Sequence, residues 1–191
     1  QAAESFPDFD QRHELDYVLG RCFASQAEFD RARQAYQRVV RSPQGEGTEA
    51  AARAQFMIGE TYFHQRNYAT ALREFQPLAR QGNASAQNNL GVMYRNGQGV
   101  AQDYAEAAKW YRRAAEQGHA SAQNSLGFMY AKGQGVAQDY AEAVRWFRLA
   151  ADQGDALAQY NIGLRYHNGQ GVAQDHAQAV KWFRLAAEQG Y

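Results

Sequence analysis

The sequence has almost no cysteine, no excess of either charge and no long apolar run. Its single cysteine, Cys22, cannot form a disulfide within the chain, so cysteine usage does not indicate a redox compartment. The residues around Cys22 follow a helical apolar pattern. We therefore expect Cys22 to be a small core residue and not a nucleophile.

The balanced charge argues against a polyanionic partner. The 191 residues include 20 Lys and Arg and 20 Asp and Glu, so no positive excess draws the chain to nucleic acid or to an anionic membrane. No apolar run is long enough to span a bilayer, and residues 1–20 lack the basic start and apolar stretch of an uncleaved secretion signal. We expect no nucleic-acid binding and no membrane insertion. The start at Gln1 is compatible with signal cleavage, so the compartment is open, with a periplasmic or secreted location slightly favoured over a cytoplasmic one.

A 36-residue period organises the later part of the chain. The segment Leu90-Gly91-Val92-Met93-Tyr94 recurs at residues 126–130 and again at 162–166. Self-similarity at such a period is typical of solenoids, in which each repeat is one supersecondary unit. The same step relates three further sets of residues: Asp103, Asp139 and Asp175; Trp110, Trp146 and Trp182; Gly118, Gly154 and Gly190.

Each 36-residue unit predicts two helices separated by a loop. In the first unit Asn83 can cap a helix that ends at Gly97, which we expect to adopt the left-handed conformation. A loop then leads to Asp103, a second N-cap, and the second helix ends at Gly118. We refer to the two as helix A and helix B of a repeat.

A glycine lies in the middle of each predicted helix A, at Gly91, Gly127 and Gly163. Glycine inside a helix costs about 1 kcal/mol relative to alanine. The expected compensation is steric, because a glycine lets helix B or its tyrosine approach closely.

The earlier part of the chain follows the same logic with a loop four residues shorter. Two sets of residues correspond at a spacing of 39, and residues 42–48 form a linker between their units. The first set is Gly20, Phe23, Phe29, Ala32 and Tyr36, and the second is Gly59, Tyr62, Tyr68, Ala71 and Phe75.

These patterns resemble two known repeat families. Residues 14–80 resemble two tetratricopeptide repeats, and residues 83–190 resemble three Sel-one-like repeats, whose signature is the run from Ala86 to Gly118. The resemblance implies an all-α, right-handed solenoid superhelix of antiparallel helix pairs, with the A helices lining a concave groove that binds peptides or proteins. The predicted boundaries are an N-terminal extension at 1–13, tetratricopeptide-like repeats at 14–41 and 49–82, the linker at 42–48, and Sel-one-like repeats at 83–118, 119–154 and 155–191.

The A-helix residues that point away from the core stripe are the candidate partner-binding positions. They combine aromatic side chains with arginine and asparagine, a mixture that suits recognition of a protein surface or peptide. The tetratricopeptide family's clamp for a C-terminal carboxylate is not supported, because its positions hold Tyr17 and Arg21, then Phe56 and Glu60. The candidates are Tyr17, Arg21, Phe56, Glu60, Phe63, His64, Asn88, Val92, Arg95, Asn124, Phe128, Tyr160, Leu164 and His167.

No residue pattern predicts a catalytic centre, a cofactor or a metal. The segment Gly97-Gln98-Gly99 follows a helix and lacks a third glycine, so we interpret it as a turn and not a phosphate cradle. Glu60 and His64 share a helix face with no second histidine, which favours a polar surface pair over a metal site. The other histidines show no ligand spacing. The periodic tryptophans are interpreted as inter-repeat packing in preference to sugar stacking.

The leading hypothesis for function is therefore a non-catalytic scaffold or adaptor, bacterial and associated with the envelope or with secretion. The first alternative is a β-lactam-binding or β-lactam-hydrolysing protein like some cysteine-rich Sel-one-like proteins, which the single cysteine argues against. A further alternative is a structural segment of a larger assembly. After Tyr191 no polar helix covers the apolar residues near Trp182 and Phe183, which predicts self-association through the last repeat or continuation into further repeats.

Overall fold

The computed structural model describes residues 12–42 and 48–191, and every regular element within them is an α-helix. The predicted extension at 1–13 and the linker at 42–48 lie mostly outside these ranges. The all-α solenoid fold class predicted from the sequence is confirmed. The helices are α1 (Arg12–Ser25), α2 (Phe29–Arg41), α3 (Glu49–His64), α4 (Tyr68–Arg80), α5 (Ala84–Asn96), α6 (Tyr104–Glu116), α7 (Ala120–Lys132), α8 (Tyr140–Asp152), α9 (Ala156–Asn168) and α10 (His176–Glu188).

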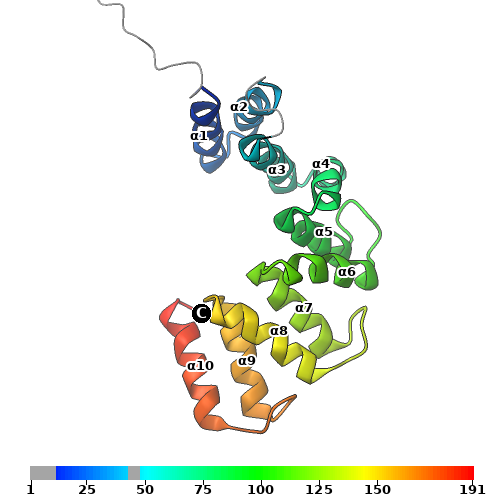
Figure 1. Cartoon of the computed structure of the whole chain (residues 1–191), viewed down its shortest axis with the longest axis vertical. Coiled ribbons are helices and arrows are strands. Elements are labelled where there is room, and N and C mark those ends of the chain that lie inside the picture. The colour runs from blue at the N-terminus through cyan, green and yellow to red at the C-terminus, as the bar shows by residue number, and fades with distance from the viewer. Residues whose placement is uncertain (1–11, 43–47) are drawn as a thin grey trace, which may run out of the picture. The chain divides into compact units, whose positions relative to one another are not determined.

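The chain divides into two compact units, and the division falls within α4, between Leu78 and Ala79. In the first unit α2 packs against both α1 and α3. In the second unit α5 pairs with α6, α7 with α8 and α9 with α10, and each pair packs on the next (Figure 1). Odd-numbered helices are the A helices and even-numbered helices are the B helices.

Helix ends in the second unit form where the sequence predicts them. The Asn83 Oδ1 atom accepts a hydrogen bond from the Ala86 backbone N at 2.9 Å, and Asp103 Oδ1 accepts one from Glu106 N at 2.9 Å. These bonds satisfy amides that have no partner within their own helix. Gly97 ends α5 with φ of +67°, which confirms its predicted left-handed cap and the turn interpretation of the loop that follows.

In the second and third 36-residue repeats, the longer loop between helix A and helix B contacts the preceding repeat. Gly135, in the loop between α7 and α8, lies so close to the backbone of Tyr104 and Ala105 at the start of α6 that a Cβ there would collide with it. Gly171 stands in the same relation to Tyr140 at the start of α8. The longer loop therefore adds a backbone contact between neighbouring repeats.

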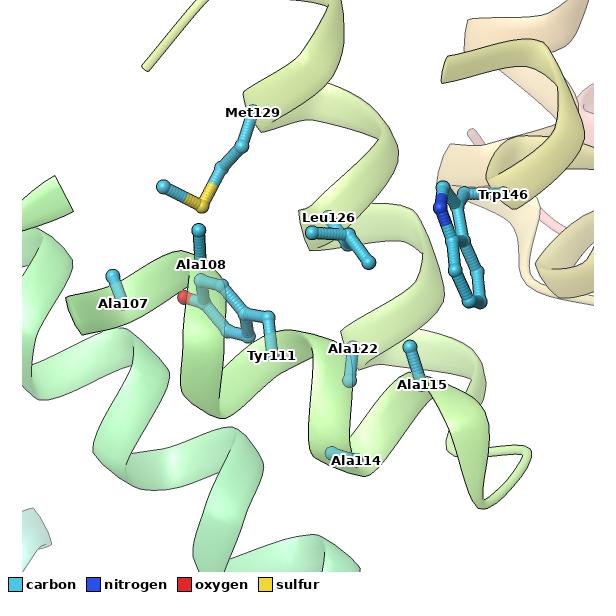
Figure 2. Packing of buried hydrophobic residues seen from close by; sticks show 9 residues of the cluster. All are labelled: Ala107, Ala108, Tyr111, Ala114, Ala115, Ala122, Leu126, Met129 and Trp146. Carbon is cyan, nitrogen blue, oxygen red and sulfur yellow. The ribbon is translucent and has the colours of Figure 1, made fainter. Parts of the chain in front are cut away.

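The core of the second unit is a layer of small residues into which a few large side chains fit. Between α6 and α7, Tyr111, Leu126 and Met129 are fully buried among alanines (Figure 2). Trp146 from α8 approaches Leu126 of its own repeat and Ala115 of the preceding repeat. Trp182 of α10 packs in the same way against the cluster formed by α8 and α9. The prediction that the tryptophans serve inter-repeat packing is confirmed for Trp146 and Trp182.

The glycines in the middle of the A helices are explained by close contact with an aromatic ring of helix B. A Cβ added to Gly91 would lie 2.6 Å from Cδ1 of Tyr111, well inside van der Waals contact. This confirms the steric explanation predicted from the sequence. The same contact recurs between Gly20 and Tyr36, Gly59 and Phe75, Gly127 and Phe147, and Gly163 and Phe183.

The interpretation of Cys22 as a core residue was wrong. Cys22 is exposed on α1, and its sulfur accepts a hydrogen bond from Gln26 Nε2 at 3.6 Å on the same helix. Leu15 and Val18 are also exposed, with 60% and 58% of their surface accessible. The apolar pattern of α1 is broader than the face that α2 and α3 cover, so helical periodicity alone does not show which side is buried.

Candidate functional site

Three rows of side chains cross the A helices of the second unit, one residue per helix in each row. The 36-residue step places Asn88, Asn124 and Tyr160 in one row, Val92, Phe128 and Leu164 in the next, and Arg95, Ala131 and His167 in the third. Within α5 and α9 the three positions are spaced by four and three residues, so they lie on one side of each helix. We call this surface the A-helix face.

The middle row is apolar and only partly covered. Val92 packs against the core cluster of α6 and α7, and Phe128 packs against that of α8 and α9. Both side chains, like Leu164, are half-buried. The ammonium of Lys132 lies 5.9 Å from the centre of the Phe128 ring. The row therefore offers apolar contact bordered by polar and cationic groups.

The first row is less accessible than the sequence suggests. Asn124 is 7% exposed, and its Oδ1 accepts a hydrogen bond from Nδ2 of Asn161 at 2.9 Å. This bond joins α7 to α9, so Asn124 positions two A helices and is not exposed to a ligand. Asn88 is half-buried, and its Oδ1 is enclosed without a hydrogen-bond partner.

The arginine of the third row lies close to a buried tyrosine of helix B. Burial raises the pKa of Tyr111, whereas the positive charge of Arg95 acts to lower it. In the first unit burial, helped by Tyr17, raises the pKa of Tyr36 to about 12, and Arg21 opposes this rise. Both tyrosines are therefore neutral at physiological pH, and neither is a proton donor or base poised for catalysis.

In the first unit several candidate residues pack helix A against helix B of the same repeat. The Tyr17 ring lies 5.8 Å from that of Tyr36, and the Phe56 ring lies 5.5 Å from that of Phe75. Phe63 packs edge-on against Tyr68 at the start of α4, with 5.3 Å between ring centres. All three candidates are half-buried, so each presents only part of its ring.

The predicted pair of Glu60 and His64 is present on α3. His64 Nε2 lies 3.7 Å from Glu60 Oε2, and the imidazole stacks on Phe29 with 6.1 Å between ring centres. His64 is exposed, so this ion pair contributes little to stability. Among the described residues no three side chains of His, Cys, Asp or Glu converge as metal ligands.

The last A helix carries two exposed candidates, Tyr160 and His167. Tyr160 of α9 is 37% exposed, and its ring contacts Phe183 at 5.5 Å and Tyr191 at 5.2 Å between ring centres. His167 is exposed in the last turn of α9. Aromatic side chains that are both exposed and held by neighbours lose little entropy when a partner covers them.

Sequence reasoning missed a ladder of glutamines that links the repeats. Gln123 Nε2 donates to the Ala115 carbonyl at 3.1 Å, and its Oε1 accepts from Gln153 Nε2 at 2.7 Å. The same arrangement recurs around Gln87 and around Gln159. The recurrence of Gln87, Gln123 and Gln159 every 36 residues was the sequence signal that could have indicated these contacts. Buried amides that donate and accept in this way fix the register of neighbouring helix pairs.

A second missed contact joins helix B of one repeat to helix A of the next. Arg112 donates a hydrogen bond to the Tyr130 hydroxyl, and Arg148 does the same to the Tyr166 hydroxyl.

None of the helices in the described parts of the chain has the length and apolar character needed to cross a bilayer.

The helix pairs, the close contacts at the mid-helix glycines and the recurring caps define an all-α repeat protein of the solenoid class. The Sel1 repeat family matches residues 84–119, 120–155 and 156–191, and the tetratricopeptide repeat family matches residues 1–47 and 17–79. The chain belongs to the Sel1 repeat family, with tetratricopeptide repeats preceding the Sel1 repeats. Repeats of this kind generally mediate protein–protein interactions.

Three solved structures illustrate the similarity. A Sel1 repeat protein from Oxalobacter formigenes is 35% identical, with a TM-score of 0.76 over 92% of this chain and 71% of that one. A protective antigen of uropathogenic Escherichia coli strains, which displays an SLR fold, is 44% identical with a TM-score of 0.71. That match covers 73% of this chain but only 31% of the antigen, so the chain spans about a third of its length.

The MamA protein shares the fold alone, at 20% identity and a TM-score of 0.56 over 94% of this chain and 92% of that one. A search of curated protein sequences found no match.

Proposed function

We propose that this protein is a non-catalytic scaffold that binds a peptide or protein through its A helices. The observation that carries the proposal is the half-buried apolar row of Val92, Phe128 and Leu164 between two more polar rows. An apolar centre with a polar rim is the usual composition of a protein-binding surface. The membership in a repeat family that generally mediates protein interactions supports the same conclusion.

Affinity capture from the native cells, read by quantitative mass spectrometry, tests this proposal. The test variant carries Phe63→Ala, Arg95→Ala and Tyr160→Ala, one position on each of three A helices. We expect it to lose about tenfold or more of the captured partner, because aromatic and arginine side chains dominate interface energy. Its helical circular dichroism should equal that of the parent.

The matched control carries alanine substitutions at three exposed residues of B helices: Arg73, Lys109 and Lys181. It should capture the partner as the parent does. Equal capture by the test variant and the parent would show that the partner does not bind through these three A-helix positions. Turnover of a chromogenic β-lactam, abolished by a single substitution, would instead support the enzymatic alternative.

The location in the bacterial envelope, periplasmic or secreted, is part of this proposal. Two of the similar structures come from bacteria, and one of them is a protective antigen, a description that fits a protein displayed to the host. Fractionation of the native cells tests the location. Recovery in the cytoplasm alone would contradict it.

Self-association through the last repeat is also proposed. Val180 of α10 is 55% exposed, whereas Val144, its equivalent in α8, is 7% exposed, and α8 packs against α9 of the following repeat. A second copy that covers α10 would remove this apolar surface from water. Light scattering at micromolar concentration should show a dimer, and Val180→Asp should return it to the monomer. A parent protein that stays monomeric would contradict the pairing.

A further inference from the structure

Two histidines of the last repeat come together where α9 ends and α10 begins. His167 lies in the last turn of α9, and His176 is the first residue of α10. Their ring centres are 5.1 Å apart, the planes are inclined by 56°, and both side chains are exposed. Eight residues lie between them along the chain, a spacing that no common ligand motif uses. The loop between the helices creates the pair.

The loop that brings the two histidines together is well defined. Gly169 ends α9 in the left-handed conformation with φ of +65°, and Gln174 Nε2 donates to the His167 carbonyl oxygen at 2.8 Å. Asp175 caps α10 through a bond of 2.9 Å from the Gln178 backbone N to its Oδ1. The backbone on both sides of the pair is therefore held in place without the imidazoles, and no described residue forms a hydrogen bond with either ring.

The pair is a departure from the repeat pattern. At the position of His176 the two preceding repeats have Tyr104 and Tyr140, whose hydroxyls accept hydrogen bonds from the loop glutamines at 3.2 Å and 3.1 Å. At the position of His167 they have Arg95 and Ala131. The fold of a Sel1 repeat therefore does not require histidine at either position.

The separation of the two rings matches that of two imidazoles bound to one metal ion. Zinc binds a histidine nitrogen at about 2.0–2.1 Å, which places the ion about 3.2 Å from the ring centre. Two such rings at a tetrahedral angle have centres about 5.2 Å apart. The observed separation is 5.1 Å.

We propose that His167 and His176 form an open binding site for a divalent transition-metal ion, zinc in the first instance. Imidazole is a ligand that zinc prefers, and two histidines leave coordination positions for water or for a group from another molecule. The site requires only residues of this chain and therefore does not depend on the proposed scaffold function. Because His167 belongs to the A-helix face, a bound ion would place an open coordination position at the edge of that face.

The test is a titration of the metal-stripped full chain with zinc chloride, followed by calorimetry and by the NMR signals of the histidine side chains. We expect one saturable event with one zinc per chain, which shifts the signals of His167 and His176 and leaves those of His64 unchanged. The variants His167→Ala and His176→Tyr introduce residues that this chain already uses at the equivalent positions of its second Sel1 repeat. Each should therefore fold, and each should weaken zinc binding at least tenfold.

The variant His64→Ala is the matched control, since it removes an exposed histidine that lies beside a carboxylate. It should bind zinc as the parent does. The proposal is overturned if the parent shows no saturable binding, or if binding survives in both His167→Ala and His176→Tyr. A stoichiometry of one zinc per two chains would also overturn it, because the ligands would then come from different copies.

Discussion

At the residue scale, the glycine in the middle of helix A has a steric role that a substitution can measure. Gly91→Ala should lower the free energy of unfolding by about 1–3 kcal/mol, because the new methyl group must displace the buried Tyr111 ring. This loss opposes a gain of about 1 kcal/mol in helix propensity, so the sign of the change in unfolding free energy shows which effect is larger. Chemical denaturation measures the free energy of unfolding of the parent and the variant. Ser121→Ala, at an exposed position of α7, is the control and should change stability by less than about 0.5 kcal/mol. A stabilised Gly91→Ala variant would refute the steric explanation.

His119 gives stability a dependence on pH. It caps α7 by accepting a hydrogen bond from the Ala122 backbone N at its Nδ1 atom, over 3.3 Å, and this requires a neutral ring. Burial lowers the pKa of His119 below its ordinary value, so folding favours the neutral form. The stabilisation is complete above the pKa of the unfolded chain, near 6.5, and is lost as the pH falls below it.

The variant His119→Asn tests this pH dependence, because Asn83 already caps α5 in the same way and does not titrate. Between pH 7.5 and pH 5 the parent should lose about 1 kcal/mol more stability than the variant, the usual contribution of an N-cap. Thermal unfolding at both pH values gives the comparison. Identical losses would show that protonation of His119 does not weaken the cap.

At the scale of elements, the longer loop of a Sel1 repeat connects that repeat to the one before it. Gly135→Ala should destabilise the protein more than Gly118→Ala does. Both glycines have positive φ, of +69° and +87°, so both variants incur the left-handed strain of about 1 kcal/mol. Only at Gly135 would the methyl group also collide with the backbone of Tyr104, whereas the space around Gly118 is open.

Equilibrium unfolding of the two glycine variants gives the comparison. An equal loss of stability in Gly135→Ala and Gly118→Ala would mean that the loop can move away from α6 without cost, and that its contact does not stabilise the repeat interface.

The elements themselves follow from local signals in the sequence. The caps at Asn83 and Asp103 and the end of α5 at Gly97 were all predicted, because each depends on residues within one or two turns. The exposure of Cys22 and the burial of Asn124 were not. Both depend on which neighbouring helix covers a given face, and periodicity along a single helix carries no such information.

At the scale of the whole molecule, the repeat predicts which surface recurs but not what each repeat contributes to it. Row positions on the A helices could be read from the 36-residue step. The same step marks Gln123 as a recurring residue but does not show its bond to Gln153. It gives no sign of the approach of His167 to His176 either, because such contacts form through the stacking of helices or through loop geometry. Differences between equivalent positions, such as Tyr140 and His176, are therefore where function specific to this chain is to be sought.

The solenoid architecture also predicts how stability varies along the second unit. Helices α8 and α10 share nine of thirteen residues, so their intrinsic helix propensities are nearly equal. Their burial differs: Ala151 is 3% exposed but its equivalent Ala187 is exposed, and Trp146 is buried whereas Trp182 is half-buried. In a repeat array each repeat is stabilised mainly by its neighbours, and amide hydrogen exchange reports the free energy of local opening.

Amides of α10 should therefore exchange at least about tenfold faster than the equivalent amides of α8, which corresponds to about 1.4 kcal/mol less protection. Hydrogen exchange measured by mass spectrometry, at a protein concentration too low for self-association, gives both rates in one experiment, and the similar sequences of α8 and α10 serve as each other's control. Equal protection of the two helices would mean that propensity within each helix, and not packing between repeats, stabilises this array. Rising protection of α10 with protein concentration would show in addition that a second copy covers the surface around Val180.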